Sequence, residues 1–253
     1  MTTIALLIPA LNEEQGIQRT AIAARDAIDQ GLITQAYVLD GGSVDRTPEI
    51  AESHGLTVVH VASCLSHLGP VLGKGDSLFR GVHSIDADWY VFLDADLGNI
   101  SSGHIAALVK PIGQTDVRFV KGGFVRVDEN GTPRDVPGGR VTEEYGRPLL
   151  RQIAPELANL SQPLSGQVAI EAHVARSLSF VTGYGVEIAM LIDVWEKMGA
   201  TAMTEADMGN INNRWKPDAD LSDVIADVVS ASRLRGITDT WADIAMSVSE
   251  RRS

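Results

Sequence analysis

The chain has 253 residues, 44% of them hydrophobic, which is enough for the core of one large α/β domain or of two lobes. Its 21 basic and 33 acidic residues give a formal net charge of −12, which disfavours nucleic acid and anionic membranes as partners. No apolar run is long enough to span a membrane, and the single cysteine, Cys64, excludes an internal disulfide. These totals favour a cytoplasmic protein in which an anionic substrate needs a local basic cluster, a metal ion or both.

The first half of the chain alternates short apolar runs with segments of helical spacing. Strands are expected at 4–8, 36–39, 57–61 and 89–93, and helices are expected after Asn12, from about Thr47 and over 77–85. Asn12 is a candidate N-cap for the first helix. This alternation predicts an α/β fold with a mainly parallel sheet and helices on both faces. The loops 9–14, 40–45 and 94–99 then line one crevice at the carboxyl ends of the strands.

Beyond residue 115 the pattern changes. A strand is expected at 117–120, followed by a turn at 128–131, a glycine-rich segment at 137–139 and helices around 141–153, 187–198 and 221–248. We expect one compact unit with two lobes, residues 1–115 and residues 116–253. The last helical stretch has more apolar positions than one lobe needs, which predicts a homodimer; these positions include Val224, Ile225, Val228 and Val229.

Asp94-Ala95-Asp96 follows directly on the apolar strand at 89–93. Carboxylate oxygens suit Mg²⁺ or Mn²⁺, and the alternation across Ala95 lets one side chain face the ion and the other a ribose or a coordinated water. A cation held there would stabilise the charge that develops on a departing diphosphate when a sugar leaves a nucleotide. A solvated acidic turn is the alternative reading, but the strand context and the two upstream loops favour the metal, with Asp96 as its ligand.

Two earlier loops have the chemistry to bind a nucleotide. In Pro9-Ala10-Leu11-Asn12-Glu13-Glu14, main-chain groups and a carboxylate can hydrogen-bond the edge of a base and the ribose. The alternative is that Asn12 and Glu13 only cap and charge the first helix. Asp40 is followed by Gly41-Gly42-Ser43, where the backbone can approach the nucleotide closely.

Two basic segments can bind anions. Lys74 lies between glycines before a helix and can reach phosphate oxygens, although the spacing is not that of a P-loop. Gly138-Gly139-Arg140-Val141-Thr142 combines amides, a guanidinium and a hydroxyl at a helix start, which suits a phosphate or carboxylate. An ordinary glycine turn capped by Thr142 is the alternative. Further positive charge nearby comes from Lys121, Arg126 and Arg147.

Seven strings in chain order, spanning roughly residues 4 to 217, resemble the glucosyl-3-phosphoglycerate synthases. They are Ile8-Pro9-Ala10-Leu11-Asn12-Glu13-Glu14, Asp40-Gly41-Gly42-Ser43, Gly73-Lys74-Gly75-Asp76, Asp94-Ala95-Asp96, Gly138-Gly139-Arg140-Val141-Thr142-Glu143, Gln162-Pro163-Leu164-Ser165-Gly166 and Gly183-Tyr184-Gly185-Val186-Glu187. The resemblance implies a GT-A-fold, retaining glucosyltransferase, related to glycosyltransferase family 2. It implies UDP-glucose as donor, Mg²⁺ or Mn²⁺ as cofactor and 3-phosphoglycerate, or a similar small anion, as acceptor.

The resemblance also implies residue roles. A nucleotide-sugar set comprises Pro9, Ala10, Leu11, Glu13, Asp40, Gly41, Lys74, Asp94, Ala95 and Gly166, and an acceptor set comprises Gly139, Arg140, Val141 and Thr142. Asp96 binds the metal, while Tyr184 and Glu187 face the reacting sugar. We expect Glu187 to orient hydroxyl groups rather than to attack, because retaining enzymes of this fold are thought to react on one face of the sugar.

Three positions depart from the family pattern. Asn213 stands where the family has a metal-binding His, Gly41 stands where it has a Ser, and Gln167 stands where it often has a Glu. One alternative is therefore a divergent relative that uses another nucleotide sugar and another phosphorylated or carboxylated acceptor in a specialised-metabolite pathway. A second is a catalytically silent nucleotide-sugar-binding protein. A nucleotidyltransferase is disfavoured, because the glycine-rich, basic start expected after its first strand is absent.

Overall fold

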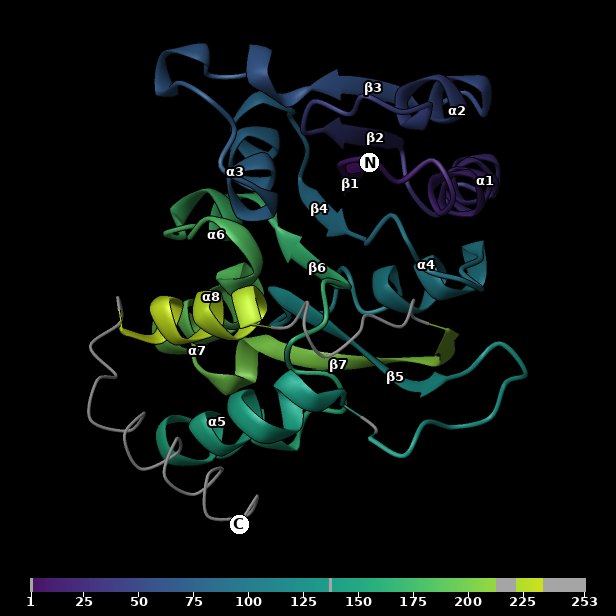
Figure 1. The fold of residues 1–253 in the computed structure, drawn as a ribbon. Coiled ribbons are helices and arrows are strands. Elements are labelled where there is room, and N and C mark those ends of the chain that lie inside the picture. Colours follow the sequence, from purple (N-terminus) through teal and green to yellow (C-terminus); the bar gives the residue numbers. More distant parts are fainter. Residues whose placement is uncertain (1, 137, 213–221, 234–253) are drawn as a thin grey trace.

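The computed structural model describes residues 2–136, 138–212 and 222–233. In this part of the chain, seven strands form a single sheet in the order β3-β2-β1-β4-β6-β5-β7 (Figure 1). The strands are β1 (Ile4–Ala10), β2 (Gln35–Asp40), β3 (Thr57–His60), β4 (Trp89–Phe92), β5 (Phe119–Val127), β6 (Val168–Glu171) and β7 (Met203–Asn212). Within the described residues only β6 runs antiparallel to its neighbours, which confirms the expected mainly parallel sheet.

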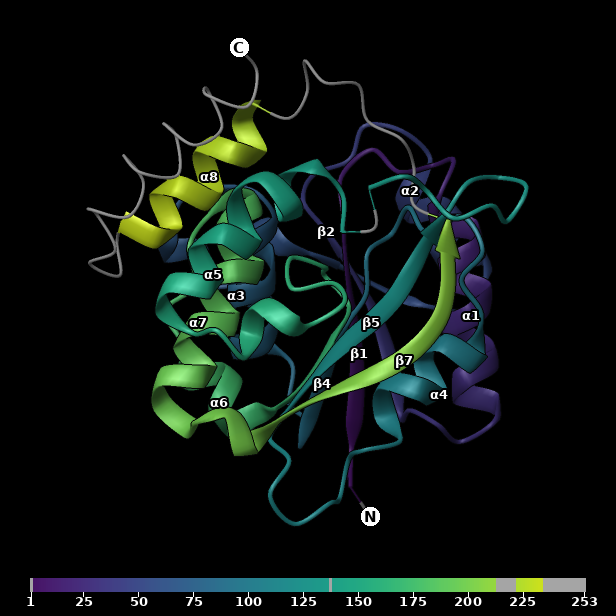
Figure 2. The ribbon, with the colours of Figure 1, turned by 90° about the horizontal axis from the view of Figure 1, so that it is seen from below.

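Helices cover both faces of this sheet. They are α1 (Ile17–Asp29), α2 (Thr47–Ser53), α3 (Lys74–Ser84), α4 (Ser102–Val109), α5 (Arg147–Ile153), α6 (Ala172–Ser177), α7 (Val186–Met198) and α8 (Ser222–Arg233), with a π-helical turn Thr142–Gly146 before α5. Figures 1 and 2 show α1, α2 and α4 on one face, and α3, α5, α6, α7 and α8 on the other. None of the described helices has the length and apolar character needed to cross a membrane.

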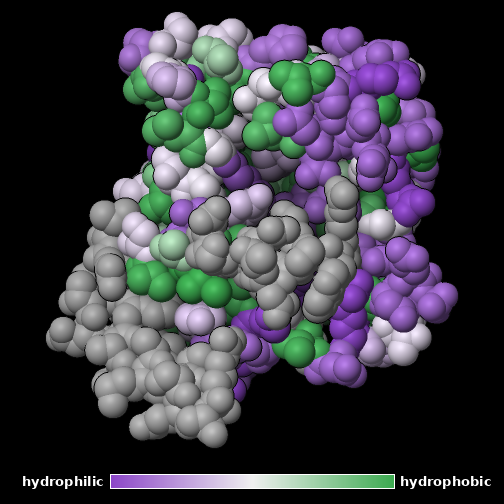
Figure 3. Space-filling view, viewed as in Figure 1, coloured by the Kyte–Doolittle hydropathy of each residue, from purple (hydrophilic) through white to green (hydrophobic). Residues whose placement is uncertain are grey.

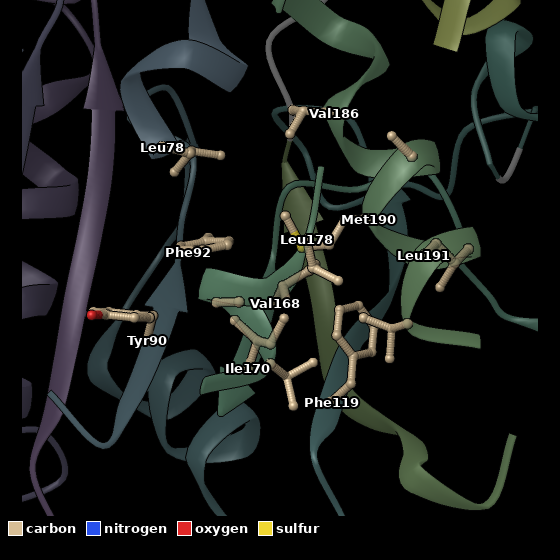
Figure 4. Packing of buried hydrophobic residues seen from close by; sticks show 14 of the residues in the cluster. Leu78, Tyr90, Phe92, Phe119, Val168, Ile170, Leu178, Val186, Met190 and Leu191 are labelled. Atoms are coloured by element: carbon tan, nitrogen blue, oxygen red, sulfur yellow. The ribbon is translucent and has the colours of Figure 1, made fainter. Parts of the chain in front are cut away.

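The core lies on both sides of the sheet because successive strand residues point to opposite faces. In β1, Leu6 belongs to the cluster under α1 and α4, and Leu7 to the cluster under α3, α6 and α7. Tyr90 and Phe92 of β4 pack in the second cluster beside Val168 and Ile170 of β6 (Figure 4). Burial on both faces explains why the central strands read as continuous apolar runs in the sequence.

The structure corrects several local expectations. Asn12 is not the N-cap of α1, which begins at Ile17 after Gly16; Asn12 instead has a φ of 56°. Lys74 is the first residue of α3 and does not lie in a loop before it. The strand expected at 117–120 extends to Val127, and β6 and β7 were not expected.

Two of the apolar positions named for α8 pack within the chain itself. Val228 is 2% exposed and belongs to the core cluster beneath α7, and Val229 packs against the same cluster. These two side chains are therefore packed within the chain itself, and the predicted homodimer stays a prediction. The helix expected to reach Val248 is described only as far as Arg233.

Arg80 fixes the connection between β3 and α3. Its side chain is 1% exposed and pairs with Asp76 at 3.1 Å, while its Nη atoms donate to the carbonyls of Cys64, Gly69 and Pro70. Asp76 in turn accepts from the Leu72 amide at 2.9 Å.

Figure 3 shows hydrophobic side chains gathered at the upper left, over this connection, and hydrophilic ones over α1 and α2 on the right.

We predict that Arg80→Ala destabilises the protein by about 3–5 kcal/mol, because it removes a buried guanidinium, leaves the mostly buried Asp76 carboxylate without its counter-ion and leaves three carbonyls without this donor. Urea denaturation monitored by circular dichroism measures the loss. Arg46→Ala is the control, since Arg46 and Glu49 form a pair with side chains 68% and 67% exposed. Equal midpoints for the two variants would contradict the role given to Arg80.

Candidate functional site

Hydrogen bonds join the loops that follow β1 and β2. The Asn12 amide donates to Ser43 Oγ at 2.9 Å, and Asn12 Oδ1 accepts from the Val44 amide at 2.9 Å. The Glu13 amide donates to Thr47 Oγ1 at 2.7 Å. Asn12 therefore links the two loops from a left-handed backbone conformation. Asn tolerates this conformation better than most residues do.

Asp40 shapes the turn after β2. Its side chain is 3% exposed. The carboxylate accepts hydrogen bonds from the amides of Gly42 at 3.3 Å and Ser43 at 3.0 Å, and His60 Nδ1 lies 3.2 Å from its Oδ2. The Gly41 amide donates to the carbonyl of Ala10 at 2.9 Å, so the two loops also meet through their backbones. A contact between Asp40 and a nucleotide stays a prediction.

Asp94-Ala95-Asp96 lies just after β4, which ends at Phe92, and packs against the start of α1. The Ala95 carbonyl accepts from the buried Thr20 hydroxyl at 3.1 Å. A Cβ atom at Gly16 would lie 2.8 Å from the Cα of Asp96, so this close approach requires glycine. The loops 9–14, 40–45 and 94–99 therefore come together at the carboxyl ends of β1, β2 and β4, as expected.

Lys74 is shared between two carboxylates. Its Nζ lies 2.5 Å from Asp94 Oδ1 and 2.5 Å from Glu187 Oε1, and all three side chains are mostly buried. Burial lowers the pKa of Lys74, but the two carboxylates outweigh it and raise that pKa well above its usual value. Burial likewise raises the pKa of Asp94, and Lys74 reverses the effect and leaves it below its usual value. The Lys74–Asp94 pair is thus ionised at neutral pH.

Gly166 and Gln167 complete the surroundings of Asp94. A Cβ atom at Gly166 would lie 2.5 Å from Asp94 Oδ1 and 2.7 Å from Lys74 Nζ, so the pair fits only against a glycine. Gln167 is fully buried, and its Nε2 donates to Asp94 Oδ2 at 2.8 Å. A glutamate at this position would face the Asp94 carboxylate with a like charge, whereas the amide donates a hydrogen bond to it.

A second lysine is buried close by. Lys121 of β5 is 1% exposed, and its Nζ donates to the carbonyl of Ser165 at 2.5 Å. Burial, helped by Lys74, lowers the pKa of Lys121 to about 8 against the opposing effect of Glu187 and Asp94. Lys121 is therefore an internal cation and does not belong to a surface patch.

The glycine-rich acceptor segment lies beside Arg126. Gly139 has a φ of 79°, and a Cβ atom there would lie 3.4 Å from Arg126 Cζ. Arg126 Nε donates to Gln162 Oε1 at 3.2 Å. Burial and the neighbouring Arg134 lower the pKa of Arg126, while Asp94 and Asp96 raise it. This guanidinium therefore stands between the acceptor segment and the acidic pair.

The remaining expected residues have mixed surroundings. Thr142 is 3% exposed in the π-helical turn, and Tyr184 is 44% exposed just before α7. Arg147 has a structural role, since it pairs with Glu143 at 3.0 Å and donates to the Ala158 and Leu160 carbonyls. Asn213 lies outside the described residues.

The carboxylate oxygens of the acidic pair fit a divalent cation that is bound mainly through substrate oxygens. Among the described residues no group of three or more His, Cys, Asp or Glu side chains could hold a metal ion by itself. Mg²⁺ is usually held by one or two carboxylates together with substrate phosphates. Asp96 lies in the loop after β4, which ends at Phe92, and its role as the metal ligand stays a prediction.

Comparison with known proteins identifies the family. Residues 5–165 match the model of glycosyl transferase family 2. The glucosyl-3-phosphoglycerate synthase of Mycolicibacterium paratuberculosis is 34% identical over 254 residues, covering 98% of this chain and 77% of that protein. The chain belongs to the glucosyl-3-phosphoglycerate synthase family.

Two solved structures extend the likeness to the fold. The glucosyl-3-phosphoglycerate synthase of Mycobacterium tuberculosis, in complex with Mn²⁺, UDP-glucose and phosphoglyceric acid, superposes with a TM-score of 0.82 at 34% identity, covering 94% of this chain and 81% of that one. The mannosyl-3-phosphoglycerate synthase of Rubrobacter xylanophilus gives a TM-score of 0.85 at 32% identity, covering 94% of this chain and 76% of that one. The chain therefore has the GT-A-type fold of its family, as expected.

Sequence reasoning missed the partners that fix the site. Glu187 lies 113 positions from Lys74, and Gln167 lies 73 positions from Asp94. A signal was present, because Gly166 ends one of the strings that resemble the family and Gln167 follows it directly. No periodicity in the sequence relates that string to the acidic pair.

We predict that Gly166→Ala lowers hexose transfer about 100-fold, because an added methyl group displaces Lys74 and Asp94 from each other. Steady-state kinetics with saturating nucleotide sugar measures the loss. Gly103→Ala is the matched control: a Cβ atom in this exposed helical position meets only Ser101 Oγ, at 3.6 Å. Full activity in Gly166→Ala would show that the site tolerates separation of the pair.

We predict that Lys121 makes folding stability rise with pH between about 8 and 10.5. Its folded pKa of about 8 lies below the unfolded value of 10.5, so in this window the unfolded state binds more protons than the folded state. Urea denaturation from pH 7 to pH 10.5 compares the wild type with Lys121→Met, which cannot titrate. Relative to the variant, the free energy of unfolding of the wild type should rise by up to about 3 kcal/mol across this pH window. Parallel curves would contradict the depressed pKa.

Proposed function

We propose that this chain transfers glucose from UDP-glucose to 3-phosphoglycerate in a reaction that requires Mn²⁺ or Mg²⁺. The observation that carries the proposal is the buried Lys74, Asp94 and Glu187 cluster beside Asp96, at the edge of the sheet where three loops meet. It is supported by family membership and by the relative solved with Mn²⁺, UDP-glucose and phosphoglyceric acid.

The cation, held by Asp96 and, in our proposal, by Asn213, supplies positive charge where the leaving diphosphate becomes more negative. The loops Pro9–Glu13 and Asp40–Gly41 bind the uridine, and their mutual hydrogen bonds hold them ready for it. Lys74 keeps Asp94 ionised and holds Asp94 and Glu187 in place. The Gly139–Thr142 segment and Arg140 bind the acceptor anion.

Glu187 orients hydroxyl groups in this proposal. Its carboxylate is 9% exposed and accepts a hydrogen bond from the Lys74 ammonium, which withdraws electron density from the oxygen and weakens it as a nucleophile. Tyr184, in the turn just before α7, is exposed enough to contact the sugar. These roles are consistent with a retaining transfer in which the enzyme forms no covalent bond to the sugar.

Two alternatives have specific support. The likeness to a mannosyl-3-phosphoglycerate synthase keeps open another nucleotide sugar as donor, with a different phosphorylated or carboxylated acceptor. A catalytically silent nucleotide-sugar-binding protein remains the second alternative, because Asn213 is a weaker, neutral ligand than the His of the family. The homodimer, the cytoplasmic location and the division into lobes at residues 1–115 and 116–253 stay predictions.

We predict that the wild type forms a glucosylated product from UDP-glucose and 3-phosphoglycerate with Mn²⁺, and that chelation by EDTA abolishes turnover. Asp96→Asn should lower kcat at least about 100-fold, because a neutral amide binds the cation poorly. Asp26→Asn, an exposed change on α1, controls for the loss of one carboxylate. Product analysis by mass spectrometry across a panel of UDP- and GDP-sugars and anionic acceptors separates the alternatives. If the protein binds the donor but shows no turnover with any acceptor, the catalytically silent nucleotide-sugar-binding protein is the alternative that remains.

A further inference from the structure

The turn before α7 lacks a cap from its own segment. The 3-10 turn Gly183–Gly185 runs directly into α7, and neither Thr182 nor Gly185 caps the start with a side-chain hydrogen bond. The first amides of such a helix have no intrahelical acceptor. Asp227 of α8 meets one of them: the Tyr184 amide donates to Asp227 Oδ2 at 2.7 Å. A residue 43 positions along the chain thus caps this turn from a neighbouring helix.

The contact between α8 and the turn leaves no spare room. A Cβ atom at Gly183 would lie 2.1 Å from Asp227 Oδ2, and one at Gly185 would lie 2.5 Å from the carbonyl oxygen of Asp227. Gly183 also has a φ of 67°, which disfavours any other residue. Both glycines therefore let α8 lie directly on the turn.

The helix that carries Asp227 is itself anchored. Val228 is 2% exposed and Ala231 is 1% exposed, and both belong to the core cluster that includes α7. Ser232 Oγ donates to the Val228 carbonyl at 2.9 Å within the helix. Asp227 is therefore presented from packed structure and not from a free surface helix.

The same turn contacts the start of α3. A Cβ atom at Gly75 would lie 1.8 Å from the Val181 carbonyl oxygen, so the backbone on either side of Lys74 is in close contact with the segment that precedes the turn. On the other side of the turn, Glu187 in the first turn of α7 pairs with Lys74 at 2.5 Å. Displacement of the turn would therefore move Glu187 relative to Lys74.

We infer that Asp227 is a positioning residue for sugar transfer: its carboxylate holds the Tyr184–Glu187 segment in register with Lys74. This inference rests on the proposed function, in which Tyr184 and Glu187 face the reacting sugar while the loops after β1 and β2 bind the nucleotide. Loss of Asp227 should then affect the reaction more than nucleotide binding. The negative charge also favours the start of α7 through the helix dipole.

The test compares Asp227→Ala, Asp227→Asn and the control Ser230→Ala, which lies on an exposed part of α8. Alanine has a higher helix propensity than aspartate, so a loss in Asp227→Ala does not come from a weaker helix. We expect Asp227→Ala to lower kcat for glucose transfer about 10- to 100-fold. The affinity for UDP with Mn²⁺, measured by calorimetry, should stay within about twofold. Asp227→Asn, which keeps an acceptor oxygen, should recover most of the rate.

Hydrogen exchange followed by mass spectrometry gives a readout that does not depend on turnover. The peptide containing Tyr184 should exchange faster in Asp227→Ala than in the wild type, and Ser230→Ala should match the wild type. Unchanged exchange, unchanged kcat or a parallel loss of UDP affinity in Asp227→Ala would overturn the inference. If the wild type transfers no sugar at all, the proposed function fails and the positioning role fails with it, while faster exchange would still establish the cap itself.

Discussion

The site depends on one ammonium group shared between two carboxylates. Lys74 begins α3, Asp94 follows β4 and Glu187 opens α7, so this contact joins three elements that are distant in the sequence. Each charge is mostly removed from water, and removal of one member would leave another buried without its counter-ion. The trio carries one positive and two negative charges, so Lys74 has no surplus charge for a phosphate in the free protein. Charge neutralisation of a diphosphate must then come mainly from the cation.

Close backbone contact is the second constraint, and it explains why short strings that look modest alone belong together. Gly16 lets the start of α1 touch the acidic pair, and Gly166 lets the chain enter β6 against Lys74 and Asp94. In both places a single methyl group would overlap with charged or backbone atoms. Close contacts between loop backbones therefore set the distances within the site. The same contacts position its functional side chains.

The sequence predicted the first half of the fold well, because strands buried on both faces leave continuous apolar runs such as that ending at Phe92. It predicted β7 poorly, because that strand is mostly polar and a register shift near Gly123 of its partner breaks the alternation of buried positions. The acidic pair and Lys74 could be found from local strings. The pairing of Lys74 with Glu187 could not, since it arises only when the turn before α7 packs against α3.

The acceptor side completes the electrostatic argument. The net charge of −12 opposes anionic substrates, but at physiological ionic strength such repulsion is screened beyond about 8 Å. Within that distance local groups decide, and Arg126 has no ion pair among the described residues although Asp94 and Asp96 attract it. Arg134 opposes this attraction, but it affects the pKa of Arg126 less than Asp94 does. In our proposal, an anion at the Gly139–Thr142 segment would lie beside the Arg126 guanidinium, which would favour a negatively charged acceptor over a neutral one.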